Sequence, residues 1–91
     1  MNVTDVRIRK IFERGPLAAI CSLTLDNCIA VHDIKIISVK GKTIVAMPSK
    51  KRADGEYSDI VHPINSDVRV QIEHAVINEY KKVQNNSDMN Y

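Results

Sequence analysis

Residues 28–39, CIAVHDIKIISV, decide the fold, because apolar side chains occupy both odd-numbered and even-numbered positions of this segment. In an extended chain Val31 and Ile37 would point to one side, and Ile34 and Ile36 would point to the other. β-Branched residues dominate the segment, which favours a strand over a helix. The pattern therefore predicts an interior β-strand that is apolar on both of its faces.

Further strands are predicted on either side of this segment. Residues 17–25 (LAAICSLTL) precede it and end at Asp26-Asn27, a pair that suits the positive φ angles of a tight hairpin turn. Lys40-Gly41-Lys42 forms a second turn, and Pro48 ends the strand that follows it because proline cannot donate to a ladder. The remaining predicted strands are the alternating segment around Val6 and Ile8, residues 43–47 (TIVAM), and a short extended piece at 58–61 that follows a polar loop over 49–57.

A helix is predicted over residues 66–83, where apolar side chains recur at spacings of three and four. Asn65 or Ser66 is its expected N-cap, and Asp67 in the first turn suits the helix dipole. Residues 84–91 lack periodicity and are predicted to be a polar, disordered tail. The expected architecture is a single α+β domain over residues 1–83, with a four- to five-stranded antiparallel meander followed by one amphipathic helix.

One helix covers only one face of a sheet, so the second apolar face of residues 28–39 needs another cover. A strand at the edge of the sheet would also need a partner for its unpaired backbone groups. Both arguments predict a homodimer in which two sheets join or stack.

The composition limits the classes of protein to which the chain can belong. At 91 residues it suits one domain, and its longest apolar run spans five residues, 17–21. A bilayer span needs about 20 residues, so no transmembrane helix is expected. The first ten residues contain no apolar core of a secretory signal, which predicts a cytoplasmic location.

No catalytic or metal-binding constellation is visible. A two-residue turn at Asp26-Asn27 would place Cys21 opposite His32 and too far from Cys28 for a disulfide, which predicts two buried free thiols and a core histidine. Asp54, Glu56 and Asp59 alternate, but two of them flank a glycine turn where Asp is favoured for backbone reasons. The sequence therefore predicts neither an enzyme, nor a metal or cofactor, nor a small-molecule substrate.

Positive charge is concentrated in the first half of the chain. Residues 1–52 carry ten Lys and Arg against four acids, and no acid lies between residues 40 and 52. Such an excess indicates a polyanionic partner, and the scarcity of aromatic residues favours phosphate contacts over base stacking. The candidate contacts are Lys40, Lys42, Lys50, Lys51 and Arg52. Arg7 and Arg9, on the solvent-facing side of the first strand, would extend this set. The helix start at 66–70 would lie near a phosphate or a groove.

Five segments closely resemble the SpoVG family of small bacterial regulators. They are TDVRIRK (4–10), VHDIKII (31–37), IVAMPSKK (44–51), DGEYSDIVHPINSDVR (54–69) and AVINEY (75–80). The similarity extends from about residue 2 to residue 82, and the combination of MPS before basic residues with HPIN before the helix is specific.

The resemblance implies a compact antiparallel sheet with a C-terminal helix, assembled as a dimer. It also implies binding of DNA, and of RNA in some members, with effects on gene expression, cell division and sporulation. The basic stretch after MPS would contact nucleic acid, which assigns Lys50, Lys51 and Arg52. The helix start would tune sequence choice, which assigns Asp67, Val68, Arg69 and Val70. The alternative hypothesis is a protein–protein adapter that acts on the division or sporulation machinery without binding nucleic acid.

Overall fold

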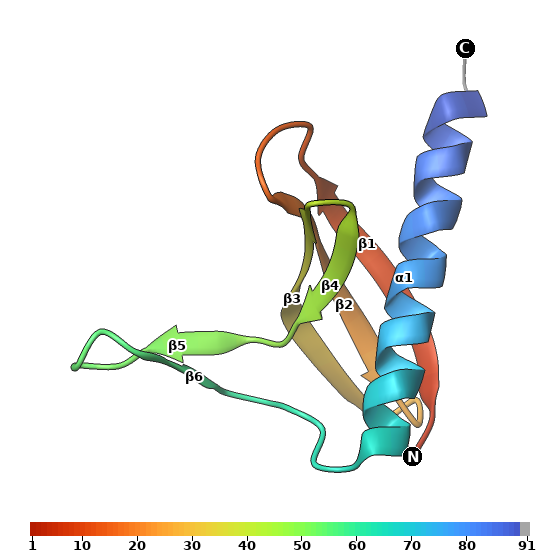
Figure 1. The fold of residues 1–91 in the computed structure, drawn as a ribbon. Coiled ribbons are helices and arrows are strands. Elements are labelled where there is room, and N and C mark those ends of the chain that lie inside the picture. Colours follow the sequence, from red (N-terminus) through yellow and green to blue (C-terminus); the bar gives the residue numbers. More distant parts are fainter. Residues whose placement is uncertain (90–91) are drawn as a thin grey trace.

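The computed structural model describes the backbone of residues 1–89 and the side chains of residues 1–84. It confirms the predicted α+β class: an antiparallel four-stranded sheet, a separate two-stranded hairpin and one C-terminal helix (Figure 1). The order in the sheet follows the chain order, as a meander does. The elements are β1 (Val3–Ile11), β2 (Leu17–Leu25), β3 (Ile29–Val39), β4 (Lys42–Ala46), β5 (Ser49–Lys51), β6 (Tyr57–Asp59) and α1 (Ser66–Met89).

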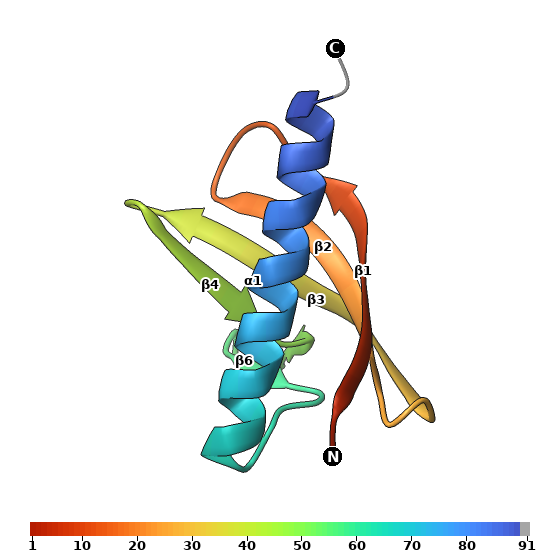
Figure 2. The ribbon, with the colours of Figure 1, turned by 90° about the vertical axis from the view of Figure 1, so that its right-hand side faces the viewer.

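Helix α1 lies across one face of the four-stranded sheet (Figure 2). Its apolar stripe places Ile72 and Val76 in the core, and both side chains are buried. The Gln71 Oε1 atom accepts a hydrogen bond of 3.1 Å from the Val3 backbone N–H, which links the helix to the edge strand β1. The sheet contributes the other buried core residues: Ala18, Ala19, Cys21, Leu23, Leu25, Val31, Ile34 and Ile36.

A β-bulge in β3 moves Val31 to the face of Ile34 and Ile36, whereas Ile37 stays on the opposite face, as predicted, and pairs there with Leu17 and Ile44. Cys21 pairs with Ile34 but Leu23 pairs with Val31, so Ser22 lies opposite two residues of β3, His32 and Asp33. Asp33 adopts a φ of 62°, a left-handed conformation that Asp tolerates better than most residues. The extra residue shifts the alternation of side chains along β3 by one position. The buried side chains at 31, 34 and 36 therefore all lie on the face under α1.

The turn between β2 and β3 is partly as predicted. Asp26 and Asn27 have φ angles of 50° and 53°, and the Cys28 N–H donates to the Leu25 carbonyl at 2.9 Å. The ladder, however, continues from Leu25 to Ile29, which leaves Cys28 outside the strand pairing. The predicted pairing of Cys21 with His32 is therefore wrong.

Both cysteines are free, as predicted, but only Cys21 is buried, because Cys28 lies exposed in the turn. The prediction of a core histidine at position 32 is also wrong, since His32 is an exposed residue of the bulge.

The helix begins where expected and ends later than expected. The Asn65 Oδ1 atom accepts hydrogen bonds from the backbone N–H groups of Asp67 (2.8 Å) and Val68 (3.2 Å), so Asn65 is the N-cap and Ser66 the first helical residue. The helix continues through Met89 instead of ending at 83, because the polar segment after 83 contains neither Gly nor Pro to stop it. Residues 90 and 91 of the predicted tail lie outside the described residues.

Candidate nucleic-acid interface

The segment predicted as a polar loop is a β-hairpin, which we call the arm and define as residues 49–59. Three backbone-paired positions hold it together: Ser49 with Asp59, Lys50 with Ser58 and Lys51 with Tyr57. Figure 1 shows the arm projecting from the end of β4, away from the side of the sheet that α1 covers. Every residue of the arm is exposed, so its shape is set by backbone hydrogen bonds and turn chemistry, without a core of its own.

The tip of the arm is a tight turn. The Gly55 N–H donates to the Arg52 carbonyl at 3.0 Å, and Gly55 has a φ of 89°, which a residue with a Cβ rarely adopts. The Asp54 carboxylate accepts the Glu56 N–H at 3.0 Å through Oδ1 and contacts the Arg52 guanidinium at 3.2 Å through Oδ2. Asp54 therefore serves the turn, as its position beside glycine predicted.

The three predicted cations of the arm differ in how free they are. Arg52 has the ion pair with Asp54, although both side chains remain more than half exposed. Among the described side chains, neither Lys50 nor Lys51 forms an ion pair. Side chains alternate along a strand, so these two lysines point to opposite faces of the narrow ribbon. The arm thus presents one free ammonium group on each face.

The structure does not bring the other predicted cations to the arm. Lys40 belongs to the β3–β4 turn, where it and Gly41 have φ angles of 52° and 79°. Lys42 begins β4, whereas the arm leaves the other end of that strand after Ala46. Lys40 and Lys42 are therefore separated from the arm by the length of β4 (Figure 1).

The predicted residues at the helix start also lie away from the arm, at the far end of the segment that leads from β6 to α1 (Figure 1). Asp67, Arg69 and Val70 are exposed there, whereas Val68 is half-buried and faces the sheet side. The Asn65 cap already satisfies the N–H groups of residues 67 and 68. Contacts from this end of the helix would therefore come from side chains more than from free backbone donors.

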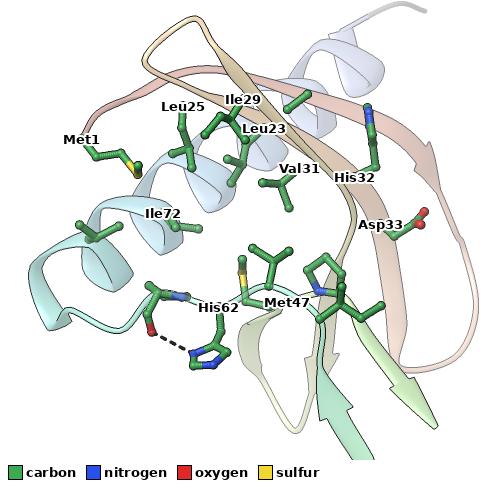
Figure 3. Close-up of a pocket in the computed structure, with 16 residues that line it drawn as sticks. Met1, Leu23, Leu25, Ile29, Val31, His32, Asp33, Met47, His62 and Ile72 are labelled. Carbon is green, nitrogen blue, oxygen red and sulfur yellow. Dashed lines mark hydrogen bonds between the residues drawn. The ribbon is translucent and has the colours of Figure 1, made fainter.

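Sequence reasoning missed an apolar groove of about 490 Å³ beside β3 (Figure 3). β4 pairs only with residues 35–39 of β3, so residues 29–34 have no neighbouring strand on that side within the described chain. The groove runs from this free edge to the start of α1, and Leu23, Leu25, Val31 and Ile72 line its floor. The sequence indicates this groove only through the difference in length between two predicted strands, residues 43–47 and residues 28–39.

The rim of the groove carries apolar side chains that remain exposed to solvent. Ile29 is 51% exposed and Ile60 is 64% exposed, and Val61 lies close to them in the lining. The His62 Nδ1 atom lies 3.3 Å from the Pro63 carbonyl, a contact within the segment that leads to the helix (Figure 3). The groove is thus an apolar surface without a cover in the described chain.

In the described part of the chain, the remaining reactive groups do not gather into a metal site or a catalytic cluster. Burial raises the pKa of the Cys21 thiol from 9.0 to about 11, which keeps it protonated at neutral pH. Among the residues that the structure describes, no three His, Cys, Asp or Glu side chains gather as metal ligands would. Within residues 1–89, no helix has both the length and the apolar character needed to cross a membrane.

Comparisons with known proteins show the family to which the sequence belongs. The SpoVG family model matches residues 1–82. A septation protein SpoVG of Clostridium perfringens is 53% identical over 85 residues, which cover 93% of this chain and 94% of the relative. The protein of that name from Clostridium acetobutylicum is 50% identical over 88 residues, covering 97% and 93%. That from Caldicellulosiruptor saccharolyticus is 53% identical over 83 residues, covering 91% and 94%. This chain belongs to the SpoVG family.

Proposed function

We propose that this chain is a cytoplasmic, non-enzymatic regulator that binds the phosphate backbone of DNA, and of RNA, through the arm. The observation that carries the proposal is the pair of free lysines, Lys50 and Lys51, on opposite faces of an exposed ribbon. Ammonium groups held away from the body, without acidic partners, suit a polyanion. Through this binding the protein would influence gene expression, and thereby septation and sporulation.

The width of the arm supports a duplex as the partner. A two-stranded β-ribbon fits the major groove of DNA, which is about 12 Å wide. In that position Lys50 and Lys51 would face the two phosphate-lined walls of the groove. Arg52 at the tip would reach the floor of the groove, where it could exchange Asp54 for a phosphate or a guanine edge.

The helix start is a second contact in this proposal. Arg69 would contact phosphate, while Asp67 and Val70 would favour some sequences over others by charge and by apolar contact. Substitutions at 67–70 should therefore reorder the ranking of a panel of duplexes. An unchanged ranking would contradict this assignment.

We also propose that two copies assemble through the free edge of β3 and the apolar groove beside it. The edge offers unpaired backbone groups, and the groove exposes Ile29 and Ile60 at its rim. A dimer would bring two arms and two helix starts to one ligand, although they are separated within one protomer. Sedimentation of an Ile29→Asp/Ile60→Asp variant should give monomers, whereas Ile44→Asp, on the half-exposed side of β4, should remain dimeric.

The adapter hypothesis is favoured by the same free edge, which could accept an extended segment from another protein. The two functions differ in what the arm does. If the chain is an adapter alone, a Lys50→Ala/Lys51→Ala variant should keep its cell-division phenotype. If nucleic-acid binding carries the function, the phenotype should be lost together with the binding.

The test of the proposed function is the salt dependence of duplex binding. With roughly three to six phosphates neutralised per protomer, a plot of log K against log salt should have a slope of about −3 to −5. Fluorescence anisotropy of a labelled 30-base-pair duplex, repeated from low to moderate salt, measures this slope. Binding that is absent or independent of salt would contradict the proposal.

A further inference from the structure

We propose that the face of the four-stranded sheet opposite α1 is a second wall of the nucleic-acid site, which holds a phosphate backbone while the arm enters the groove. This inference rests on the proposed function and names a surface that the arm alone does not include. We call this surface the open face. Its cations are Arg7, Arg9 and Lys10 from β1, Lys35 from β3 and Lys42 from β4.

The strand register places two of these lysines in one row. Lys10 pairs with Ile20, and Ile20 pairs with Lys35, so all three side chains project from the same face. Strands lie about 4.8 Å apart, so the Cα atoms of Lys10 and Lys35 are separated by about 10 Å across the middle strand. The row therefore presents two ammonium groups on either side of an apolar residue.

A bulge in β1 adds a further cation beside this row. Ile8 pairs with Cys21 and Lys10 with Ile20, so the ladder gains Arg9 as an extra residue between them. The Arg9 Nε atom donates to the Ser22 Oγ atom at 3.1 Å, which places the guanidinium over the open face. Regular alternation would have directed Arg9 and Lys10 to opposite sides of the sheet.

Negative charge on the open face is limited. Asp5 is held by Arg7 at 3.0 Å, with both side chains half exposed or more, and Asp33 lies in the β3 bulge. Lys10 has a weak partner only, because its Nζ atom lies 5.0 Å from the centre of the Phe12 ring. Five cations against two acids leave the face positive.

The arm and the open face meet at an angle. A hollow of about 200 Å³ marks the corner, where Ile20, Asp33 and Lys35 of the sheet lie next to Pro48, Ser49 and Ile60 at the base of the arm. Figure 1 shows the arm leaving on the side of the sheet away from α1. The two surfaces therefore form a concave corner with lysines on both walls.

The chemistry of the open face favours a phosphate backbone over unpaired bases. β1, β2, β3 and β4 contain no Trp, Tyr or Phe, so the sheet offers no aromatic platform for base stacking. The small Ala18 and Ser22 are buried on this face, and aliphatic side chains from Ile37 and the half-exposed Ile44 lie on its β3–β4 side. Aliphatic side chains bordered by cations suit the sugar and phosphate surface of a duplex better than stacked bases.

Lysine protection tests the inference on the wild-type protein. Acetylation with an N-hydroxysuccinimide ester, measured by mass spectrometry with and without a 30-base-pair duplex, gives a rate for each lysine. We expect Lys10, Lys35, Lys50 and Lys51 to react several-fold more slowly with the duplex, and Lys81 and Lys82 to be unchanged. Equal rates at Lys10 and Lys35 with and without DNA would overturn the inference. So would their protection in the protein alone at dimer-forming concentrations, because a second copy would then cover the face.

A charge-matched pair of variants separates the open face from the arm. Lys10→Ala/Lys35→Ala should weaken duplex binding about tenfold and reduce the salt slope by about two. Lys81→Ala/Lys82→Ala removes the same charge from exposed positions on α1 and should change neither. Circular dichroism checks the fold, and the protection experiment remains decisive if the first variant does not fold.

The outcomes distinguish the two proposals. If Lys50→Ala/Lys51→Ala weakens binding while Lys10→Ala/Lys35→Ala behaves like the α1 control, the open face is not part of the site and the arm still is. If the wild type does not bind a duplex, both proposals are overturned. If both double variants weaken binding, the two-walled site is supported.

Discussion

Strand β2 and the arm are both β-structure, yet the former is among the most buried parts of the molecule and the latter is wholly exposed. β2 has neighbours on both sides and is covered by α1 on one face, so Ala19, Cys21 and Leu23 are almost inaccessible to solvent. The arm pairs only with itself and contributes no residue to the core. Isolated two-stranded hairpins are marginally stable in water, so stability of the fold does not account for the arm.

This contrast separates the stabilising part of the molecule from the part proposed to bind. The sheet and α1 bury the apolar side chains and hold the fold together, while the arm carries free charge at little cost in stability. Substitutions in the two regions should therefore change different quantities, stability in one and binding in the other. Core changes should reduce the free energy of unfolding, and arm changes should leave it intact while altering binding.

The largest expected effect is in the core. Leu23→Ala removes a fully buried side chain and should lower the free energy of unfolding by about 2–5 kcal/mol. Tyr57→Ala removes a larger side chain from the arm, where it is 68% exposed, and should change that free energy by less than about 0.5 kcal/mol. Urea unfolding followed by circular dichroism measures both. Similar losses in the two variants would contradict the division between core and arm.

A smaller effect is expected from pH. The pKa of Cys21 is raised to about 11 by burial, so the folded state favours the neutral thiol. The contribution of this thiol to the free energy of unfolding is fully present below the unfolded pKa of about 9. It is lost as pH rises through the folded pKa, and the loss is at most about 2.7 kcal/mol. Stability should therefore fall between pH 9 and 11.

Two variants isolate this contribution of the buried thiol. Cys21→Ala should reduce the fall in the free energy of unfolding between pH 9 and 11, whereas Cys28→Ala, at an exposed turn position, should retain it. Parallel pH profiles for the wild type and the Cys21 variant would show that the buried thiol is not the cause.

The smallest expected effect on stability is at the tip of the arm. Asp54→Asn keeps an oxygen that can accept the Glu56 N–H but removes the charge that pairs with Arg52. Stability should change by less than about 1 kcal/mol because the pair is exposed. Binding to a duplex should strengthen a few-fold, since Arg52 becomes free for phosphate. Weaker binding in anisotropy titrations would show that Asp54 supports the active shape of the arm.

The order of elements could be predicted from the sequence because each has a strong local signal. Residues 17–25 and 66–83 carry the periods of a buried strand and an amphipathic helix, and Asn65 is a strong N-cap residue. The strand registers could not be predicted from the sequence, because alternation assigns side chains to faces by counting residues. A bulge adds one residue and shifts every assignment beyond it. The bulge opposite Ser22 moved Val31 to the same face as Ile34, which left Ile37 on the predicted second apolar face.

The candidate site could be predicted in composition but not in arrangement. The run of basic residues at 50–52 identified the cations, yet their separation from Lys40 and Lys42 depends on the direction in which the chain leaves β4. That direction is set by tertiary packing around Pro48 and Ile60, which no local pattern encodes. The free edge of β3 likewise arises from the difference in length between two paired strands.

The most direct test of the central claim compares two charge-matched variants with the wild type. Duplex binding is measured by anisotropy across a series of salt concentrations for Lys50→Ala/Lys51→Ala and for Lys81→Ala/Lys82→Ala. We predict that the arm variant loses about two from the salt slope and binds at least tenfold more weakly, with the free energy of unfolding unchanged. The α1 variant should match the wild type. Equal binding by all three proteins would contradict the claim that the free lysines of the arm contact the phosphate backbone.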